Sequence, residues 1–145
     1  GNYVEQFTKY TASANGTITE NSDHVAFKKV TMENSCVGWW TSESQDLTPY
    51  TSLCCEVLCT EIGQENSYTH WNTVFGVFSA TGSAVKDQEN SQANMIVGRN
   101  FTANSTKTEY RVDISSVSSG YVGVQGNGTF NLYRLFVKML FKCFS

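Results

Sequence analysis

The sequence predicts an all-β fold, a sandwich or barrel built from many short antiparallel strands. Short apolar segments, several of which alternate with polar residues, are separated by clusters of Asn, Ser and Gly that favour turns. No segment keeps a 3.6-residue apolar period between helix caps, so we expect almost no helix. The 145 residues contain no repeat or linker, which predicts one domain, residues 1–145, with its core over about 16–141.

Nine segments have the composition of strands, and turn residues separate most of them. The run Gly126-Asn127-Gly128 predicts a tight hairpin, because Asn-Gly adopts positive φ at little cost. The predicted strands are Thr17–Thr19, His24–Thr31, Val37–Trp40, Ser52–Ile62, Thr73–Ser79, Met95–Asn100, Glu109–Ile114, Tyr121–Gln125 and Thr129–Phe141.

The last predicted strand is apolar on both faces in its second half, so we expect it to be central in a sheet or covered. Strict alternation places two sets of its side chains on opposite faces. One set is Phe130, Leu132, Arg134 and Phe136, and the other is Asn131, Tyr133, Leu135 and Val137.

Two Asp residues, Asp46 and Asp113, stand two positions before a hydroxyl residue, in Asp-Leu-Thr and Asp-Ile-Ser. An Asp in this position favours hydrogen bonds between its side chain and the local backbone. We therefore predict a structured corner of the fold at each Asp. Single helical turns are expected near Leu47–Tyr50 and Ser115–Val117.

Charge and hydropathy exclude two classes of partner. The formal net charge is −3 and only 16% of the residues are charged, so the clustered Lys and Arg of a nucleic-acid interface are missing. No apolar stretch approaches the roughly 20 residues that span a bilayer, so we expect no membrane insertion. The chain begins Gly1-Asn2 without Met or a signal-peptide pattern, and we expect an excised domain or a processed product.

The cysteines are expected to be mostly buried free thiols. Three of them lie in the apolar run Leu53–Ile62, where cysteine behaves as a small hydrophobic residue. A zinc site is the alternative, but the sequence has no Cys-x-x-Cys and neither histidine has ligand spacing. A disulfide through Cys36 or Cys143 is a further alternative. The five cysteines are Cys36, Cys54, Cys55, Cys59 and Cys143.

Two stretches resemble galactose-binding-like jelly rolls. The first is Gly38-Trp39-Trp40 followed by Asp46–Val57, and the second is Tyr110–Val124 followed by a long final strand. This superfamily includes carbohydrate-binding modules of bacterial glycanases and adhesin modules of phage tails. The resemblance covers about Gly16–Phe141. It implies a jelly-roll sandwich of about eight to ten strands that binds sugar through loops at one end or through a concave sheet face.

The resemblance also implies properties beyond the fold. Many members carry a structural calcium ion, held by carboxylates and carbonyls near the chain ends. Glu5 and Glu20 are the candidate contributors here, without a complete ligand set. The oxygens of Asp87–Asn90 are a second candidate for Ca²⁺, against a solvated loop. We expect an extracellular or virion-associated location, with homo-oligomers formed through a parent assembly.

Sugars present apolar C–H faces rimmed with hydroxyls, so a sugar site needs an aromatic ring beside amide, carboxylate or guanidinium groups. Adjacent Trp39 and Trp40 in one strand must point to opposite faces, so we expect one in the core and the other exposed or in a groove. The segment Tyr68–Asn72 combines two amphipathic rings with an amide. The candidate ligand-binding residues are Trp39, Trp40, Tyr68, His70, Trp71, Asn72 and Arg99.

The candidates have structural alternatives: a core position for either Trp, a plug at the sandwich end for Trp71, and a salt bridge for Arg99. Catalysis is not expected, because no carboxylate pair, nucleophile elbow or phosphate-binding loop stands out. We therefore predict a non-catalytic carbohydrate-binding, lectin-like module whose partner is a glycan or cell-surface polysaccharide. The alternative is a structural or assembly module of a phage tail or virion protein without a sugar ligand.

Overall fold

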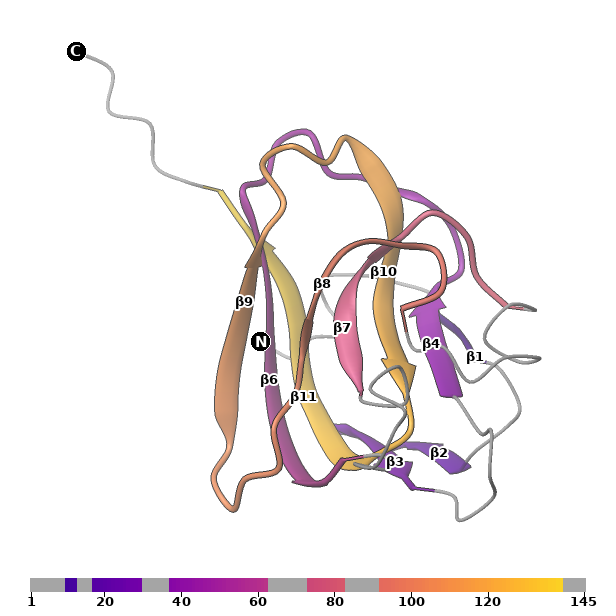
Figure 1. Ribbon diagram of the computed structural model, residues 1–145, viewed down its shortest axis with the longest axis vertical. Helices are drawn as coiled ribbons and strands as arrows, with labels where there is room; N and C mark the ends of the chain where they lie inside the picture. Colours follow the sequence, from indigo (N-terminus) through magenta and orange to yellow (C-terminus); the bar gives the residue numbers. More distant parts are fainter. Residues whose placement is uncertain (1–9, 13–16, 30–36, 63–72, 83–91, 140–145) are drawn as a thin grey trace.

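The computed structural model describes residues 10–12, 17–29, 37–62, 73–82 and 92–139, which form an antiparallel β-sandwich (Figure 1). These residues contain eleven strands, ten of them three residues or longer, and no helix, so the predicted all-β sandwich is confirmed. All nine predicted strands are present, although several ends differ, and the sequence pattern does not predict β1 or the two-residue β5. The strands are β1 (Tyr10–Ala12), β2 (Thr17–Glu20), β3 (Val25–Lys28), β4 (Val37–Thr41), β5 (Gln45–Asp46), β6 (Ser52–Glu61), β7 (Val74–Phe78), β8 (Met95–Asn100), β9 (Thr108–Asp113), β10 (Ser119–Gly126) and β11 (Thr129–Lys138).

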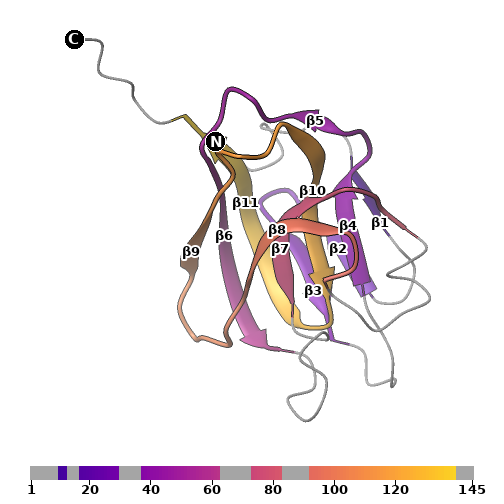
Figure 2. The ribbon, with the colours of Figure 1, turned by 45° about the horizontal axis from the view of Figure 1, so that its top comes forward.

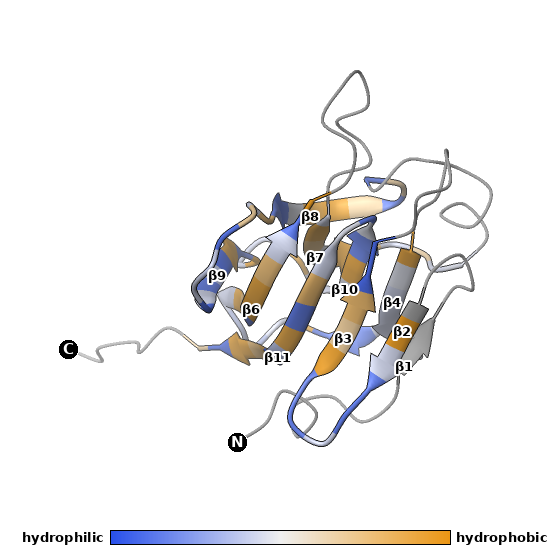
Figure 3. Ribbon diagram, turned by 90° about the horizontal axis from the view of Figure 1, so that it is seen from below, coloured by the Kyte–Doolittle hydropathy of each residue, from blue (hydrophilic) through white to orange (hydrophobic). Residues whose placement is uncertain are grey.

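Two sheets make up the sandwich. The six-stranded sheet has the order β1-β4-β10-β7-β8, with β5 paired to β10, and the five-stranded sheet has the order β2-β3-β11-β6-β9. The two layers are seen from different sides in Figures 1 and 2. As predicted, β11 is a central strand. Hydrophilic residues interrupt its apolar ones in Figure 3.

The core between the sheets is rich in aromatic rings. Phe27 stacks on Phe130 with ring centroids 4.3 Å apart, and Trp39 meets Phe27 edge-on at 6.0 Å. Phe101 lies 5.2 Å from Phe130 and 5.3 Å from Tyr110. Such pairs add about 0.5–1.5 kcal/mol each beyond the burial of their area, so this cluster ties the two sheets together.

A β-bulge interrupts the central strand β11. The register with β6 shifts between Leu132 and Arg134, which leaves Tyr133 as an extra residue without a partner on β6. Leu132 and Leu135 both belong to the core, so Tyr133 and Arg134 stand together on the outer face. Strict alternation is therefore wrong beyond Leu132, because the bulge turns Leu135 inward and Phe136 outward.

Both predicted Asp corners are confirmed. One carboxylate oxygen of Asp46 accepts hydrogen bonds from the backbone N–H of Thr48 at 3.1 Å and from its hydroxyl at 2.7 Å. Asp113 accepts the same pair from Ser115 at 2.8 and 2.6 Å. Because these hydrogen bonds favour the ionised carboxylates, they lower the pKa of both Asp residues.

The two corners meet at one end of the sandwich. The Leu47 N–H donates to the carbonyl of Ser118, and the Ile114 N–H donates to the carbonyl of Thr51, both at 2.9 Å. Leu47 and Ile114 are fully buried and close this end of the core. The helical turns predicted here are single hydrogen-bonded turns, from Tyr50 N–H to Leu47 and from Val117 N–H to Ile114. The corners therefore have a structural role.

The hairpin predicted at Gly126-Asn127-Gly128 is wrong. The flanking strands β10 and β11 lie in different sheets, so this turn carries the chain from one sheet to the other. Gly126 has a φ of 137°, which side chains rarely adopt. A Cβ on Gly128 would lie 2.6 Å from Oγ1 of Thr73. The two glycines therefore permit a tight crossing rather than a two-stranded ribbon.

Candidate functional site

Trp39 and Trp40 point to opposite faces of β4, as predicted, but neither is exposed. Trp39 is 1% exposed in the main core, and Trp40 is 0% exposed in a small apolar cluster on the outer face of the six-stranded sheet. The Trp40 ring lies over Gly38, where an added Cβ would be 2.0 Å from it, and its Nε1 donates to Oε1 of Gln125 at 2.8 Å. The prediction that one of the pair is exposed is wrong, and neither presents a ring face to a ligand.

Arg99 lies at the edge of the sandwich where β8 and β9 approach each other. Its cross-strand partner Phe75 is in the core, so the Arg99 side chain extends from the inner side of its sheet. Its Nη1 donates to the carbonyl of Arg111 at 3.2 Å, and its guanidinium carbon is 5.1 Å from the Tyr110 ring centroid. This arrangement joins the two sheets, and a role in ligand binding stays a prediction.

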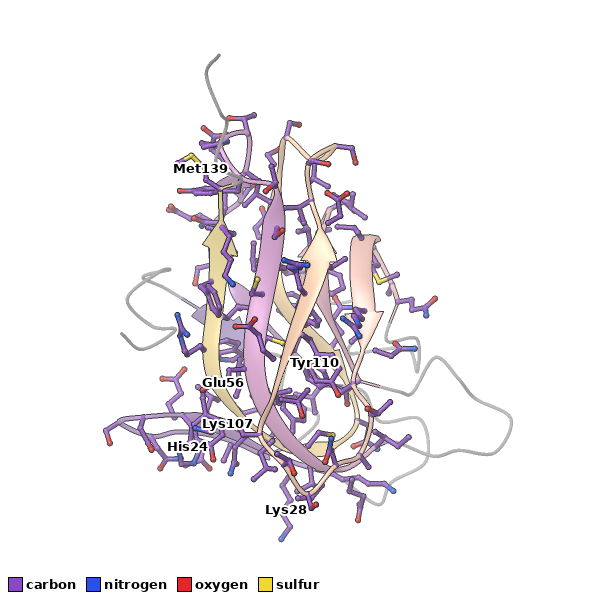
Figure 4. All side chains as sticks on the ribbon, turned by 90° about the vertical axis from the view of Figure 1, so that its left-hand side faces the viewer. His24, Lys28, Glu56, Lys107, Tyr110 and Met139 are labelled. Carbon is purple, nitrogen blue, oxygen red and sulfur yellow. The ribbon has the colours of Figure 1, made fainter. Side chains whose placement is uncertain are left out.

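Polar and aromatic side chains gather instead on the outer face of the five-stranded sheet. We call this surface the β11 face and define it by His24, Glu56, Lys107, Asn131, Tyr133 and Arg134. His24, Glu56 and Lys107 come from three different parts of the chain and lie on the side of the sheet seen in Figure 4. The bulge in β11 accounts for the centre of this surface, because it puts an aromatic ring beside a guanidinium group.

The Tyr133 ring lies between a histidine and a lysine. The His24 ring is tilted by 40° to it with centroids 5.4 Å apart, and Nζ of Lys107 is 4.2 Å from its centroid. The same Nζ is 3.6 Å from an oxygen of Glu56. Lys107 is half exposed, and a cation on an exposed ring is worth only about 0.5–1 kcal/mol. A ligand can therefore displace this lysine from the ring.

The turn between β2 and β3 holds His24 in place. Its Nδ1 is 2.7 Å from Oδ1 of Asp23, and its Nε2 is 3.3 Å from Nδ2 of Asn21. The Asn21 N–H also donates to the His24 carbonyl at 2.9 Å. These contacts order the imidazole before any ligand arrives, which reduces the entropy lost on binding.

A shallow groove of about 540 Å³ lies beside the two rings. Thr19, Ala26 and Asn131 form one row across three strands, and Ala26 and Asn131 stand two residues from His24 and Tyr133. On one face of a strand, two residues correspond to about 7 Å, so the rings border the groove. The small side chain of Ala26 keeps its floor low. The lining residues are Thr19, Ala26, Phe27, Lys28, Lys29, Glu61, Thr129 and Asn131.

Beyond Tyr133 the β11 face continues into a group of cations around an aromatic ring. The Arg134 guanidinium carbon is 4.1 Å from the centroid of Phe136, and Nζ of Lys138 is 5.4 Å from the same centroid. Lys138 also lies 3.8 Å from Glu109. Although Phe136 points outward, these side chains leave it only 7% exposed.

The thiols of Cys54, Cys55 and Cys59 are free and buried, as predicted. Burial raises the pKa of all three thiols, most strongly that of Cys55. They therefore stay protonated near neutral pH and are poor nucleophiles and metal ligands. Cys36 and Cys143 lie outside the described residues.

Several predicted sites lie outside the described residues: Tyr68, His70, Trp71 and Asn72, together with the calcium candidates Glu5 and Asp87–Asn90. The described ranges contain no group of three or more His, Cys, Asp or Glu side chains that could hold a metal ion. Glu20 accepts a hydrogen bond from Nε1 of Trp39 at 3.4 Å. Within the same ranges, no helix has the length and apolar character needed to cross a membrane.

The chain is similar to three solved structures of other proteins. One is a low-affinity xylan-binding module, CBM86, from the gut symbiont Roseburia intestinalis, with a TM-score of 0.54 and 12% identity over 97% of this chain and 93% of that one. Another is the K1 cleaved adhesin domain of Lys-gingipain from Porphyromonas gingivalis, with a TM-score of 0.49 and 17% identity over 92% and 85%. The third is the glycoside hydrolase domain of Endo-D from Streptococcus pneumoniae, with a TM-score of 0.48 and 15% identity over 92% of this chain and 22% of that one.

At 12% identity, the likeness to the xylan-binding module shows a shared fold. No family model matches the chain, and no curated protein matches it. The galactose-binding-like superfamily, and the expectation that the chain is not an enzyme, therefore stay predictions.

Sequence reasoning missed the β11 face. It assigned Tyr133 and Arg134 to opposite faces of the strand, because it applied strict alternation to the whole segment. A signal was present: four apolar residues of this strand, Phe130, Leu132, Leu135 and Val137, are spaced by two, three and two. The single step of three is the mark of an extra residue, and hence of a bulge.

Proposed function

We propose that the β11 face binds a glycan. Tyr133 stacks against a sugar ring beside the ordered His24 ring, while Asn131 and Arg134 form hydrogen bonds with its hydroxyl groups. The observation that carries this proposal is the bulge, which puts an aromatic ring next to a shallow groove on the outside of a sheet. Apolar C–H faces match the ring, and amide and guanidinium groups match the hydroxyls.

Two further observations support this proposal. The groove is bordered by residues on paired strands, which are more rigid than loops and lose less entropy on binding. A sandwich of similar fold is a xylan-binding module in Roseburia intestinalis. We expect weak affinity per site, about millimolar to micromolar, with avidity supplied by several copies.

The other predicted contacts remain part of this proposal. Tyr68, His70, Trp71 and Asn72 stay candidate contacts of the glycan, and Arg99 stays a candidate contact at the edge where β8 and β9 approach each other. Such a module would be extracellular or part of a virion, and its partner would be a glycan or polysaccharide on a cell surface.

Affinity electrophoresis through gels that contain a panel of polysaccharides tests the proposal. We expect Tyr133→Ala to weaken binding by about fivefold to tenfold, which corresponds to the worth of a stacked pair. Asn131→Ala should also weaken it. The matched control is Asn100→Ala, an exposed asparagine on β8 in the other sheet, which should bind like the wild type.

Two results would overturn this assignment. Loss of binding in Asn100→Ala, with retention in Tyr133→Ala, would move the site to the six-stranded sheet. Failure of the wild-type protein to bind any member of a broad glycan array would favour the structural module of a phage tail or virion.

A further inference from the structure

The charged groups on the outer side of the five-stranded sheet are unequally paired. Each acid on β6 and β9 is engaged: Glu56 by Lys107, Glu61 by Lys29, Glu109 by Lys138, and Asp113 by the N–H and hydroxyl of Ser115. The same surface carries further cations that have no acidic partner among the described residues.

The remaining cations are Lys28, which lines the groove, and two arginines. Within the described residues, no carboxylate lies within ion-pair distance of the guanidinium of Arg134 or of Arg111. Phe136, Cys54 and Arg111 are cross-strand partners in one row on the outer face of the sheet. The guanidinium carbon of Arg134 lies 4.1 Å from the Phe136 ring centroid, so both arginines lie on this face. Strands two positions apart in a sheet are separated by about 10 Å, so the two guanidinium groups flank the buried Cys54.

We propose that the β11 face selects acidic glycans, with Arg134 and Arg111 binding the carboxylates of sugar acids. This inference rests on the proposed function and names the class of glycan that the same surface prefers. A planar guanidinium group matches a carboxylate with two parallel hydrogen bonds, which a hydroxyl group cannot reproduce.

The Arg134 side chain is already ordered for this role. Its guanidinium carbon lies 4.1 Å from the centroid of Phe136, and this contact restricts the side chain before a ligand arrives. Tyr133 is its neighbour in the chain and on the face, so one ligand can stack on the tyrosine and place its carboxylate at the arginine.

The net negative charge of the whole chain opposes nonspecific binding of polyanions. The formal net charge is −3, which repels polyanions at long range. Binding of an acidic polysaccharide therefore depends on local contacts and not on general ion exchange.

The test compares two polyuronates, polygalacturonate and alginate, each with its methyl ester, which has the same backbone without the charge. We expect the wild-type protein to bind at least one polyuronate about tenfold more tightly than its ester. Arg134→Met should abolish this preference, because it removes the guanidinium group while the new apolar side chain still covers Phe136. Arg111→Met should reduce the preference, and Asn100→Ala, on β8 in the other sheet, should leave it unchanged.

Equal binding of acid and ester by the wild type, or a preference that survives in Arg134→Met, would overturn the inference and leave the glycan site intact. Stronger binding to dextran sulfate than to every polyuronate, lost in Arg134→Met, would overturn the choice of carboxylate. Loss of ester binding in Tyr133→Ala supports the glycan site independently, so the two proposals can fail separately. Thermal unfolding of each variant checks that the fold is retained.

Discussion

The two outer faces of the sandwich both carry an outward aromatic residue, and they use it in opposite ways. On the six-stranded sheet, Trp40 lies in an apolar cluster with Val74 and Phe78 and is fully buried. On the five-stranded sheet, Tyr133 lies among charged and polar groups and remains partly exposed. One face is therefore an extension of the core, and the other is the surface that we propose binds a ligand.

The difference follows from what surrounds each ring and not from the ring itself. Gly38 leaves room for the Trp40 indole to lie against its own strand, and Gln125 links the indole N–H to the carbonyl of Ala93. Tyr133 instead stands on a bulge, where the His24 ring and a half-exposed lysine flank it. An outward aromatic residue indicates a binding surface only where the chain does not fold over it.

The largest expected effect separates the two rings by stability. Trp40→Ala should lower the free energy of unfolding by about 3–5 kcal/mol, because it opens a cavity and leaves Gln125 without its donor. Tyr133→Ala should lower it by about 1 kcal/mol or less, as expected for a partly exposed residue. Urea unfolding measures both values, and equal losses would contradict the distinction between the faces.

The next prediction tests the bulge that orients the β11 face. Leu135→Ala should cost about 2–5 kcal/mol because Leu135 is fully buried, whereas Arg134→Ala should cost about 1 kcal/mol or less. Strict alternation predicts the reverse order. Chemical denaturation of the two variants therefore decides which of the neighbouring residues points inward.

Acid should weaken the end of the sandwich that joins the two sheets. The lowered pKa values of Asp46 and Asp113 mean that their carboxylates stabilise the fold above pH 3.8 and lose this contribution as the pH falls below it. The melting temperature of the wild type should therefore fall more steeply between about pH 5 and pH 2 than that of an Asp46→Asn/Asp113→Asn variant. Parallel profiles would show that these turns contribute no acid sensitivity.

The smallest effect concerns the lysine that covers Tyr133. Lys107→Met should raise the affinity for an uncharged glycan by about twofold to fivefold. The glycan then binds without displacing the lysine from the Tyr133 ring, a contact worth about 0.5–1 kcal/mol. Lys107→Arg keeps a cation over the ring and serves as the control. Calorimetric titration measures the change, and weaker binding in Lys107→Met would make the lysine a ligand contact instead.

Local chemistry made much of the fold predictable. The two Asp corners follow from residues two positions apart, and the strands follow from short apolar segments between turn residues. The Gly126-Asn127-Gly128 run misled because a local turn signal cannot say whether the next strand joins the same sheet or the opposite one. The position of β11 between β3 and β6 settles that, and it depends on distant parts of the chain.

The candidate site was less predictable, because exposure depends on tertiary packing. Alternation correctly separated Trp39 from Trp40, yet nothing near them in sequence indicates that Gln125 and residues around Ala93 bury the second ring. The β11 face likewise combines His24, Lys107 and Tyr133, which are far apart in the chain. Only the uneven apolar spacing in β11 gives a local sign of it.

The place of β11 in its sheet also has a consequence for folding order. Val25 of β3 pairs with Leu132, 107 positions later in the chain, and Leu53 of β6 pairs with Val137, 84 positions later. Both pairings of β11 are therefore long-range. Until Thr129–Lys138 is in place, β3 and β6 each expose an unpaired edge that can join another chain. Long-range closure of this kind is slow, so aggregation during synthesis or refolding should compete with insertion of the central strand.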